Sequence, residues 1–291
     1  MEKGLCAAIG DFDGVHLGHC EVINAAVNNK YGHTPAVYTF EKNCKNARII
    51  TDNNTKRKLI EQLGVKEIIF DDFSAIKNLS PEKFIKEILI DKYGIASIVC
   101  GTDFRFGKNA SGDTELLKKL AKEHNIGFEA VKQYTFMGEK LSSSKIRELI
   151  SAGDMDSVEA VLGHRYSVSG KVIHGKHLGT KNKAPTVNIE FEKSNIVPAY
   201  GVYVTKVDVG GEIYNAISNV GIRPSVETGR KPNVETHIFG FDKEIYGQDI
   251  TVEFIKMIRP EIKFRKQDLL FEQIRKDIQM AKTYFNGENN E

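Results

Sequence analysis

The first half of the chain alternates short apolar runs with amphipathic stretches. The apolar runs predict buried strands at residues 5–9, 36–40, 67–70, 95–100 and 128–131. The stretches between them have helical spacing and predict helices at 17–28, 55–63, 81–93 and 114–124. Ser80 and Pro81 mark one helix start, because serine caps a helix and proline fits its first position. This alternation predicts a doubly wound parallel sheet that binds ligands beyond the carboxyl ends of its strands.

The pattern changes near residues 162–164, which predicts a domain of residues 1–163 followed by one of residues 164–291. From Tyr166 onward, alternating runs punctuated by Gly, Pro and Asn dominate. They predict the strands of a small antiparallel β-barrel at 166–174, 186–191, 202–209, 213–220, 236–241 and 251–258. A C-terminal helix packed on the barrel is predicted by one apolar face, formed by Leu270, Ile274, Ile278, Ala281 and Phe285.

Composition narrows the class of protein. With 41% apolar and 27% charged residues, the chain is expected to be an ordered globular protein. A net charge of +2 argues against a general nucleic-acid partner, and protein partners stay open. No run of 18 apolar residues or signal-like N-terminus occurs, so we expect a cytoplasmic protein without a membrane span. The four cysteines, Cys6, Cys20, Cys44 and Cys100, form no C-x-x-C pair and are expected to be incidental thiols.

The most informative stretch is residues 10–19, Gly-Asp-Phe-Asp-Gly-Val-His-Leu-Gly-His, which follows a predicted strand and opens a helix. Gly10 and Gly14 allow a tight turn, and Gly18 allows a ligand to approach the backbone. His16 and His19 are three apart, so both can face one anion at the positive end of the helix. Isolated histidines are more often surface or core residues, but the strand–turn–helix context favours a phosphate site.

A second stretch, residues 141–147, reads Leu-Ser-Ser-Ser-Lys-Ile-Arg. Ser142, Ser143 and Ser144 can cap a helix whose first turn carries Arg147. Hydroxyl groups, backbone N–H groups and a guanidinium together suit a polyphosphate. Alone, such a serine cluster is usually only a cap; together with the histidine turn it predicts a nucleotide clamp.

These motifs resemble the adenylyltransferase half of bacterial bifunctional riboflavin kinase/FMN adenylyltransferases. The family's G-x-F-D-G-x-H-x-G-H is matched by Gly10, Phe12, Asp13, Gly14, His16, Gly18 and His19. Its S-S-T-x-I-R is matched at Ser142, Ser143, Ile146 and Arg147, with Ser144 in place of threonine. Its G-x-D-F-x-F-G segment is matched at 101–107, which implies that Asp103, Phe104 and Phe106 line the nucleotide and flavin pocket.

The resemblance implies that FMN attacks the α-phosphorus of ATP, with Mg²⁺ bridging the phosphates, and that FAD and pyrophosphate form. His16 and His19 are then assigned to the α-phosphate. Ser142, Ser143 and Arg147 are assigned to the leaving pyrophosphate. No covalent intermediate is needed, because positioning and charge stabilisation suffice for this reaction.

The second half resembles the riboflavin kinase module of the same family. Matches include Pro185-Thr186, Asn188, residues 219–224, which contain Asn219 and Arg223, and Glu235-Thr236-His237. The resemblance implies that Thr186 and Asn188 bind Mg²⁺ and phosphate. It also implies that Asn219 and Arg223 bind ATP or the flavin, and that Glu235 is the base that takes the proton of the riboflavin 5′-hydroxyl.

Two segments depart from the family pattern. Residues 40–44 read Phe-Glu-Lys-Asn-Cys where F-E-P-H-P is usual, so the Pro-His-Pro after Glu41 is missing. Residues 180–184 replace most of the G-R-x-L-G-F loop, although both predicted metal ligands and the base remain. An FMN adenylyltransferase with an inactive kinase module is therefore the nearest alternative. An adenylyltransferase for phosphopantetheine or nicotinamide mononucleotide, and a non-catalytic flavin-binding regulator, are the others.

Overall fold

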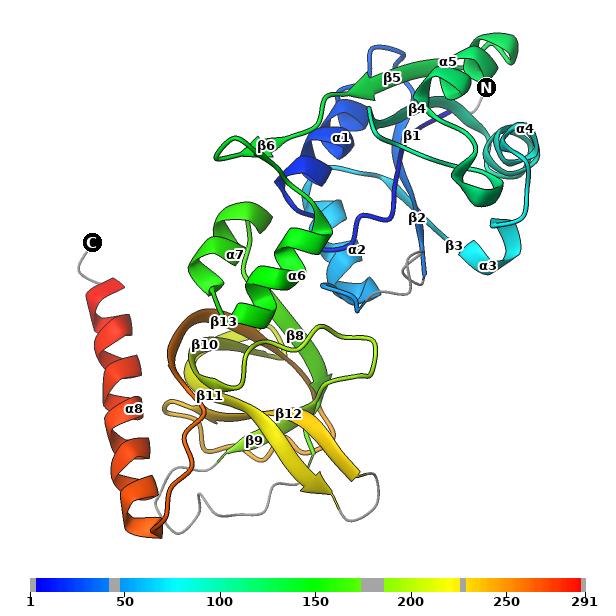
Figure 1. The fold of residues 1–291 in the computed structure, drawn as a ribbon. Coiled ribbons are helices and arrows are strands. Elements are labelled where there is room, and N and C mark those ends of the chain that lie inside the picture. The colour runs from blue at the N-terminus through cyan, green and yellow to red at the C-terminus, as the bar shows by residue number, and fades with distance from the viewer. Residues whose placement is uncertain (1–3, 42–47, 174–185, 226–228, 289–291) are drawn as a thin grey trace. The chain divides into compact units, whose positions relative to one another are not determined.

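A computed structural model describes residues 4–41, 48–173, 186–225 and 229–288. The chain divides into two compact units, Met1–Ser143 and Ser144–Glu291 (Figure 1). The predicted boundary between functions, at residues 163 and 164, stays a prediction. Both departures from the family pattern, after Glu41 and at 180–184, lie outside the described residues, as does the side chain of Arg223.

The first unit is built on a five-stranded sheet in which every pairing is parallel. Its strands are β1 (Leu5–Ile9), β2 (Thr34–Phe40), β3 (Glu67–Asp71), β4 (Ile95–Gly101) and β5 (Gly127–Val131). Their order, β3-β2-β1-β4-β5, places β1 beside β4 at the point where the winding direction reverses (Figure 1). The crevice at such a point is where open parallel sheets bind ligands. The predicted fold of this half is confirmed.

Helices cover both faces of this sheet. They are α1 (Leu17–Val27), α2 (Asn53–Gln62), α3 (Phe73–Ile76), α4 (Pro81–Lys83), the π-helix η1 (Phe84–Lys92), the short 3₁₀-helix η2 (Lys108–Ala110) and α5 (Thr114–Glu123). Since successive strand residues point to opposite faces, Cys6 and Ala8 pack with α1 and α2, whereas Ala7 and Ile9 pack with η1 and α5. Ser80 caps α4 and Pro81 begins it, as predicted.

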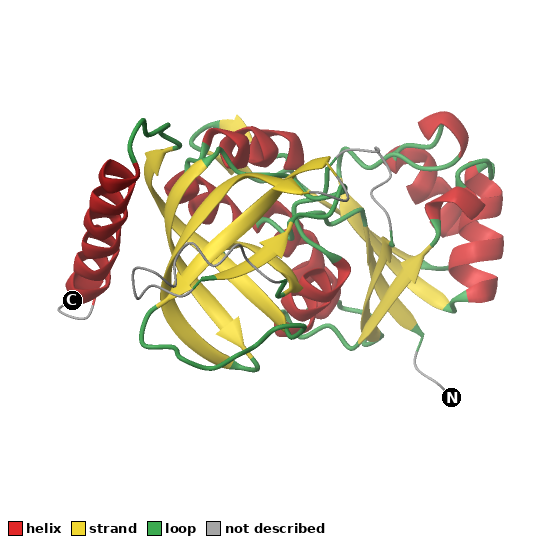
Figure 2. Ribbon diagram, turned by 90° about the horizontal axis from the view of Figure 1, so that it is seen from below, coloured by secondary structure: helices red, strands yellow, loops and turns green. Residues whose placement is uncertain are grey.

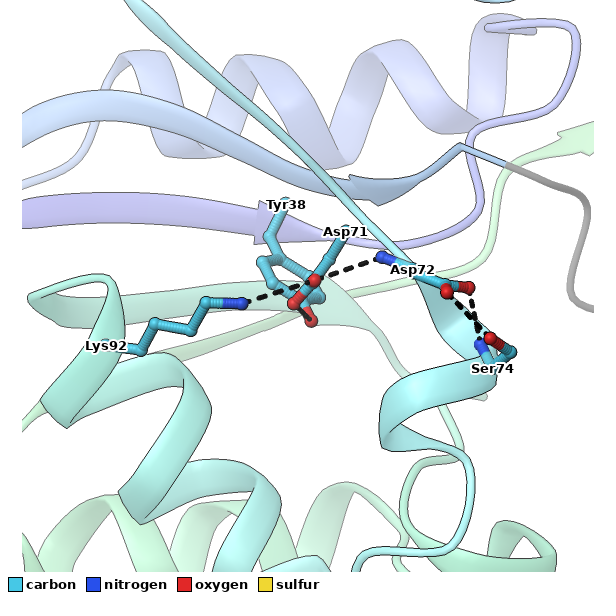
Figure 3. A network of polar contacts seen from close by, with 5 residues as sticks. All are labelled: Tyr38, Asp71, Asp72, Ser74 and Lys92. Carbon is cyan, nitrogen blue, oxygen red and sulfur yellow. Dashed lines mark hydrogen bonds and ion pairs between the residues drawn. The ribbon is translucent and has the colours of Figure 1, made fainter.

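A polar network fastens η1 to the end of β3 (Figure 3). The Asp71 carboxylate accepts a hydrogen bond from the Tyr38 hydroxyl at 2.8 Å, and Lys92 Nζ lies 3.4 Å from its other oxygen. Asp72, the next residue, caps α3 through the backbone N–H and hydroxyl of Ser74. These contacts fix the carboxyl ends of β2 and β3 by satisfying a nearly buried charge.

The second unit is an antiparallel barrel with helices. It comprises α6 (Ser143–Ala152, which begins at the last residue of the first unit), α7 (Met155–Leu162), β8 (Tyr166–Lys171), β9 (Val187–Glu190), β10 (Gly201–Val209), β11 (Glu212–Ser225), β12 (Gly229–Ile238), β13 (Asp249–Pro260) and α8 (Gln267–Glu288). The strand order is β8-β13-β10-β11-β12-β9, and a bridge between Ile173 and Asn188 joins its two edges. Figure 2 shows these strands curled around one another with α8 beside them. The predicted barrel and C-terminal helix are confirmed.

The helix α8 packs on the barrel through the predicted apolar face. Ala281 and Phe285 are buried in one cluster with Val202, Val204 and Ile217, and Ile278 packs against it. In the part of the chain that the structure describes, no helix is long and apolar enough to cross a membrane.

Three cysteines lie among the described residues, and Cys6, Cys20 and Cys100 are all free thiols. Burial, helped by the charge of Asp103, raises the pKa of the Cys100 thiol to about 12. Such a thiol is a poor nucleophile at neutral pH. The incidental role predicted for the thiols stays a prediction, and Cys44 lies outside the described residues.

Candidate active sites

The turn that joins β1 to α1 has a strained backbone. Phe12, Gly14 and Val15 have φ angles of 48°, 88° and 40°, in the left-handed region. Gly14 adopts this conformation freely, which agrees with the predicted tight turn. A β-branched residue such as Val15 adopts it only at a cost of about 1–3 kcal/mol, and such strain concentrates at functional sites. The surrounding contacts must therefore hold the turn in place.

Asp13 fastens this turn to the segment before α2. Its Oδ1 accepts hydrogen bonds from the backbone N–H groups of Ile50 at 2.8 Å and Thr51 at 3.3 Å. The N–H of Gly14 in turn donates to the Thr51 hydroxyl at 3.1 Å. Asp13 is only 2% exposed, so the structure gives its carboxylate a supporting position. Direct binding of a ligand by Asp13 stays a prediction.

His16 caps helix α1 with its own side chain. The backbone N–H of His19 donates to His16 Nδ1 at 3.2 Å. Because this nitrogen is an acceptor, the neutral imidazole of His16 carries its proton on Nε2. The rings of His16 and His19 stack with centroids 3.5 Å apart. One imidazole N–H is thus fixed at the start of a helix, where an anion is favoured.

His19 is the less buried residue of that pair, although one of its ring nitrogens is enclosed. Its Nδ1 is buried and has no hydrogen-bond partner among the described residues, and the Phe12 ring meets it edge to face at 5.3 Å. Burial, followed by the nearby His16 and Lys56, holds the pKa of His19 well below its ordinary value of 6.5. His19 is therefore neutral at physiological pH. It can act as a hydrogen-bonding group without repelling its stacked neighbour.

The lowered pKa of His19 predicts acid-dependent stability. The unfolded chain binds a proton at this residue more readily than the folded chain does. Above pH 6.5 this residue therefore leaves the free energy of unfolding unchanged. As the pH falls below 6.5, the free energy of unfolding decreases by up to about 1.4 kcal/mol per pH unit. Between pH 6.5 and 5.5 we expect the free energy of unfolding of wild type to fall by more than that of His19→Gln, by at most about 1 kcal/mol. Urea unfolding followed by circular dichroism measures both, and parallel pH profiles would contradict the prediction.

Lys56 lies beside the histidine turn, and no motif included it. Its side chain is 4% exposed, and its ammonium donates to the backbone carbonyl of Asp11 at 2.9 Å. It lies one turn before Ile60 on the buried stripe of α2, so a positive charge reaches the histidine turn. A lysine where the helical pattern calls for an apolar residue is the sequence signal that could have identified it.

Two glycines of the motif make room for aromatic rings. A Cβ atom on Gly10 would lie 3.0 Å from the ring of Phe12. A Cβ atom on Gly18 would lie 3.3 Å from the ring of His16 and 3.2 Å from Cβ of Tyr134. These glycines therefore allow the rings of the turn to pack closely. Approach of a ligand to Gly18 stays a prediction.

The loop after β4 lies across the reversal point from this turn. Phe104 and Phe106 stack with centroids 5.8 Å apart, and Phe106 is buried in the core. The Asp103 carboxylate is paired with Lys140 at 2.8 Å. Partial burial opposes ionisation of Asp103, but hydrogen bonds from Lys140 and Gln133 outweigh it and lower its pKa. The loop thus presents a carboxylate and the partly buried Phe104 beyond the carboxyl end of β4.

One residue of the serine motif contacts the histidine turn. The Ser143 hydroxyl donates to the backbone carbonyl of Asp13 at 3.1 Å, and α6 begins at Ser143. Ser142 precedes the helix, as a capping residue would. Ser144 and Arg147 follow in α6 and belong to the second unit, so their part in the nucleotide clamp stays a prediction.

In the second unit, the predicted kinase residues share one face of two paired strands. Asn188 of β9 lies directly opposite Glu235 of β12. The Thr186 hydroxyl, one residue before β9, donates to Glu235 Oε1 at 2.8 Å. Glu235 is half-buried and Asn188 is 3% exposed. The three residues that the sequence predicts for phosphoryl transfer are therefore neighbours.

Two cavities meet at Thr186. One, of about 300 Å³, is lined by Glu235, Asn219 and apolar residues that include Ile217 and Phe271. The other, of about 280 Å³, is lined by residues that include Thr236, Phe241 and Tyr246. Both are large enough to hold much of a ring system of a substrate. Thr186 thus lines both cavities.

An ion pair holds α8 against the larger cavity. Arg259 of β13 donates to both carboxylate oxygens of Asp277 on α8, at distances from 2.7 to 3.1 Å. Asp277 is 2% exposed and also accepts from Gln273 at 2.8 Å. Such a bidentate, hydrogen-bonded pair fixes geometry as well as charge. It closes one wall of the cavity that contains Glu235.

Comparison with known proteins covers both units. The family model for FAD synthetase matches residues 1–145, and that for riboflavin kinase matches residues 162–285. The bifunctional riboflavin kinase/FMN adenylyltransferase of Bacillus subtilis is 36% identical and aligns with 96% of this chain and 92% of its own length. That of Haemophilus influenzae is 33% identical, with 98% and 96% covered.

A solved structure has the same fold. A crystal structure described as that of a macrolide-efflux protein from Streptococcus pneumoniae is 27% identical, with a TM-score of 0.86 and coverage of 97% of this chain and 95% of its own. Its description differs from the names of the relatives. The relatives, which match almost the whole chain in sequence, decide the assignment: this chain belongs to the family of bifunctional riboflavin kinase/FMN adenylyltransferases.

Proposed function

We propose that this chain makes FAD in two steps. Residues 164–291 transfer the γ-phosphate of ATP to riboflavin, and residues 1–163 transfer AMP from a second ATP to the FMN formed. Family membership over nearly the whole length supports both activities. The observation that carries the adenylyl transfer is the stacked His16–His19 pair at the start of α1.

In the adenylyl transfer, an oxygen of the FMN phosphate attacks the α-phosphorus of ATP, and the bond to the β-phosphate oxygen breaks. Negative charge builds on the α-phosphate oxygens and on the leaving pyrophosphate. The Nε2–H of His16 is preorganised to donate to that charge, with His19 stacked against it. Ser142, Ser143 and Arg147 are assigned to the pyrophosphate. Asp103 and Phe104 are assigned to the flavin and nucleotide pocket.

In the kinase, the riboflavin 5′-hydroxyl oxygen attacks the γ-phosphorus and ADP leaves. The larger cavity, with Glu235 at its edge, suits the flavin, and the smaller one suits the nucleoside of ATP. Glu235 accepts the proton of the hydroxyl that attacks. The Thr186 hydroxyl, which donates a hydrogen bond to Glu235 in the structure, lies where the phosphates would pass between the two cavities. Asn219 lines the flavin cavity, and Arg223 keeps its predicted role in binding.

The kinase residues fit a magnesium ion. Thr186, Asn188 and Glu235 offer the oxygen donors that Mg²⁺ requires. Asn188 Nδ2 is buried without a hydrogen-bond partner among the described residues, so this amide is incompletely satisfied in the protein alone. Mg²⁺ supplies charge neutralisation of the phosphates.

We further infer that the protein acts in the cytoplasm, with ATP and flavins as its small-molecule partners and no nucleic acid. The free thiols of Cys6, Cys20 and Cys100 are stable in a reducing compartment. ATP, which both reactions consume, is available there.

One experiment tests the proposed function. The chain is incubated with ATP and Mg²⁺, separately with riboflavin and with FMN, and the flavins are separated by chromatography. We expect FMN and then FAD from riboflavin, and FAD from FMN. FAD from FMN without FMN from riboflavin would establish the adenylyltransferase alternative with an inactive kinase. Flavin binding without any product would establish a regulator, and adenylation of phosphopantetheine or nicotinamide mononucleotide instead of FMN would establish a different transferase.

A further inference from the structure

A second asparagine lies against the predicted metal ligand of the barrel. Asn233 precedes Glu235 by two residues on β12, so its side chain projects from the same face of the strand. Asn233 Nδ2 lies 2.9 Å from Asn188 Oδ1, and the two residues are 6% and 3% exposed. The orientation of the Asn188 amide therefore depends on a buried neighbour that no motif includes.

The two amides have a second arrangement with the same packing. In the structure, Asn188 Oδ1 faces Asn233, and Asn188 Nδ2 is the buried atom without a partner among the described residues. An unsatisfied buried donor costs about 1–3 kcal/mol. Because the oxygen and nitrogen of an amide are nearly equal in size, both side chains can turn by half a revolution about Cβ–Cγ. Asn188 then donates to Asn233 Oδ1, and its own oxygen takes the place of the unsatisfied nitrogen.

Only this second arrangement suits a cation, since Mg²⁺ binds oxygen and an amide nitrogen offers it no lone pair. We propose that Asn233 is a positioning residue of the kinase site. It accepts a hydrogen bond from Asn188 Nδ2 and so holds Asn188 Oδ1 toward the metal of the ATP complex. This inference rests on the proposed kinase function of the barrel. The next contact along these strands is an ion pair between Lys231 and Glu190 at 3.3 Å. Asn233, in contrast, is neutral, and its amide can both donate and accept a hydrogen bond.

Two substitutions separate positioning from packing. Asn233→Asp can only accept a hydrogen bond, so it enforces the arrangement with Asn188 Oδ1 facing the metal. Asn233→Leu has a similar size and can neither donate nor accept, so Asn188 loses its orientation. Isothermal titration of the full chain with ADP, in Mg²⁺ and in EDTA, gives the gain in affinity due to the metal. Thr186→Ala defines the part of that gain that comes from the barrel.

We expect Asn233→Asp to keep the gain and Asn233→Leu to reduce it by about tenfold or more, as loss of a residue that orients a metal ligand typically does. ADP affinity in EDTA stays near wild type in both variants. Adding Asn188→Asp to Asn233→Leu restores the gain, because a carboxylate presents oxygen in either orientation. Failure of this rescue would assign the loss to packing and overturn the proposal.

Two other results would also overturn it. An unchanged gain in a folded Asn233→Leu variant shows that Asn188 needs no positioning. Loss of ADP affinity in EDTA by Asn233→Asp shows instead that Asn188 Nδ2 faces a phosphate oxygen. If thermal melting shows Asn233→Leu to be unfolded, retention or loss of the gain in Asn233→Asp decides alone. A wild type whose ADP affinity has no component sensitive to Thr186→Ala would refute the kinase site itself, which is a separate failure.

Discussion

His16→Asn lowers the rate of FAD formation from FMN by about a hundredfold or more and leaves the fold intact. The imidazole of His16 has two roles in this prediction: its Nδ1 caps α1 in the structure, and its Nε2–H is the proposed donor to an anion at the helix start. Asparagine is a good capping residue, so the variant keeps the first role and loses the second. Removal of one preorganised donor typically costs about 10²–10³ in rate. Steady-state assays with FMN and ATP, followed by chromatography, measure the effect.

His16→Ala is the matched control, because it removes both the donor and the cap. In addition to the slower FAD formation, its free energy of unfolding falls by about 1 kcal/mol, whereas His16→Asn has a melting temperature near that of wild type. Both variants phosphorylate riboflavin at the wild-type rate if the two reactions belong to separate units. FAD synthesis by His16→Asn at the wild-type rate would show that His16 has no part in the mechanism. A loss that appears only in His16→Ala would make it a structural cap.

Most of the fold follows from patterns that local physics imposes on the sequence. The buried parallel strands are short apolar runs without alternation, and the helix periods between them are regular, so the predicted strands lie close to β1–β5. The barrel strands are half-exposed and alternate, which made them recognisable from residue 166 onward. The helix that follows Pro81 was predicted as one helical stretch, but beyond Lys83 it has the wider π-helical winding. Sequence spacing does not distinguish that winding from an α-helix.

The strand ends were harder to predict than the strands. The alternating pattern predicted the fifth barrel strand at 236–241, whereas β12 begins at Gly229 and ends at Ile238. Residues 231–235 are largely polar, and they form a strand because they pair with the neighbouring strands β9 and β11. The candidate kinase site lies on this polar part of β12, which contains Glu235 and the proposed positioning residue Asn233. Their partners are about 45 residues away in sequence, a separation that local patterning cannot detect.

The motifs predicted the first candidate site, but the residues that support it became visible only in three dimensions. The sequence brought His16 and His19 together because helical spacing alone does so. It could not show that the Asp13 carboxylate fastens the turn to Ile50 and Thr51, or that Lys56 reaches Asp11. Those contacts join segments that are distant in sequence. They are what keeps a strained Val15 in place, so the chemistry of the motif depends on residues outside it.

Glu235→Gln lowers the rate of conversion of riboflavin to FMN by about 10²–10⁴-fold and leaves FAD synthesis from FMN unchanged. Glutamine keeps the size of the side chain and still accepts the hydrogen bond from Thr186 through its oxygen, so the site retains its geometry. Only the basic carboxylate is lost. His16→Asn is the reciprocal control, because it should remove the second reaction and spare the first. FMN formation by Glu235→Gln at the wild-type rate would mean that another group takes the proton. A wild type that binds riboflavin but forms no FMN at any ATP or Mg²⁺ concentration would mean that the barrel retains the fold of a kinase without its activity.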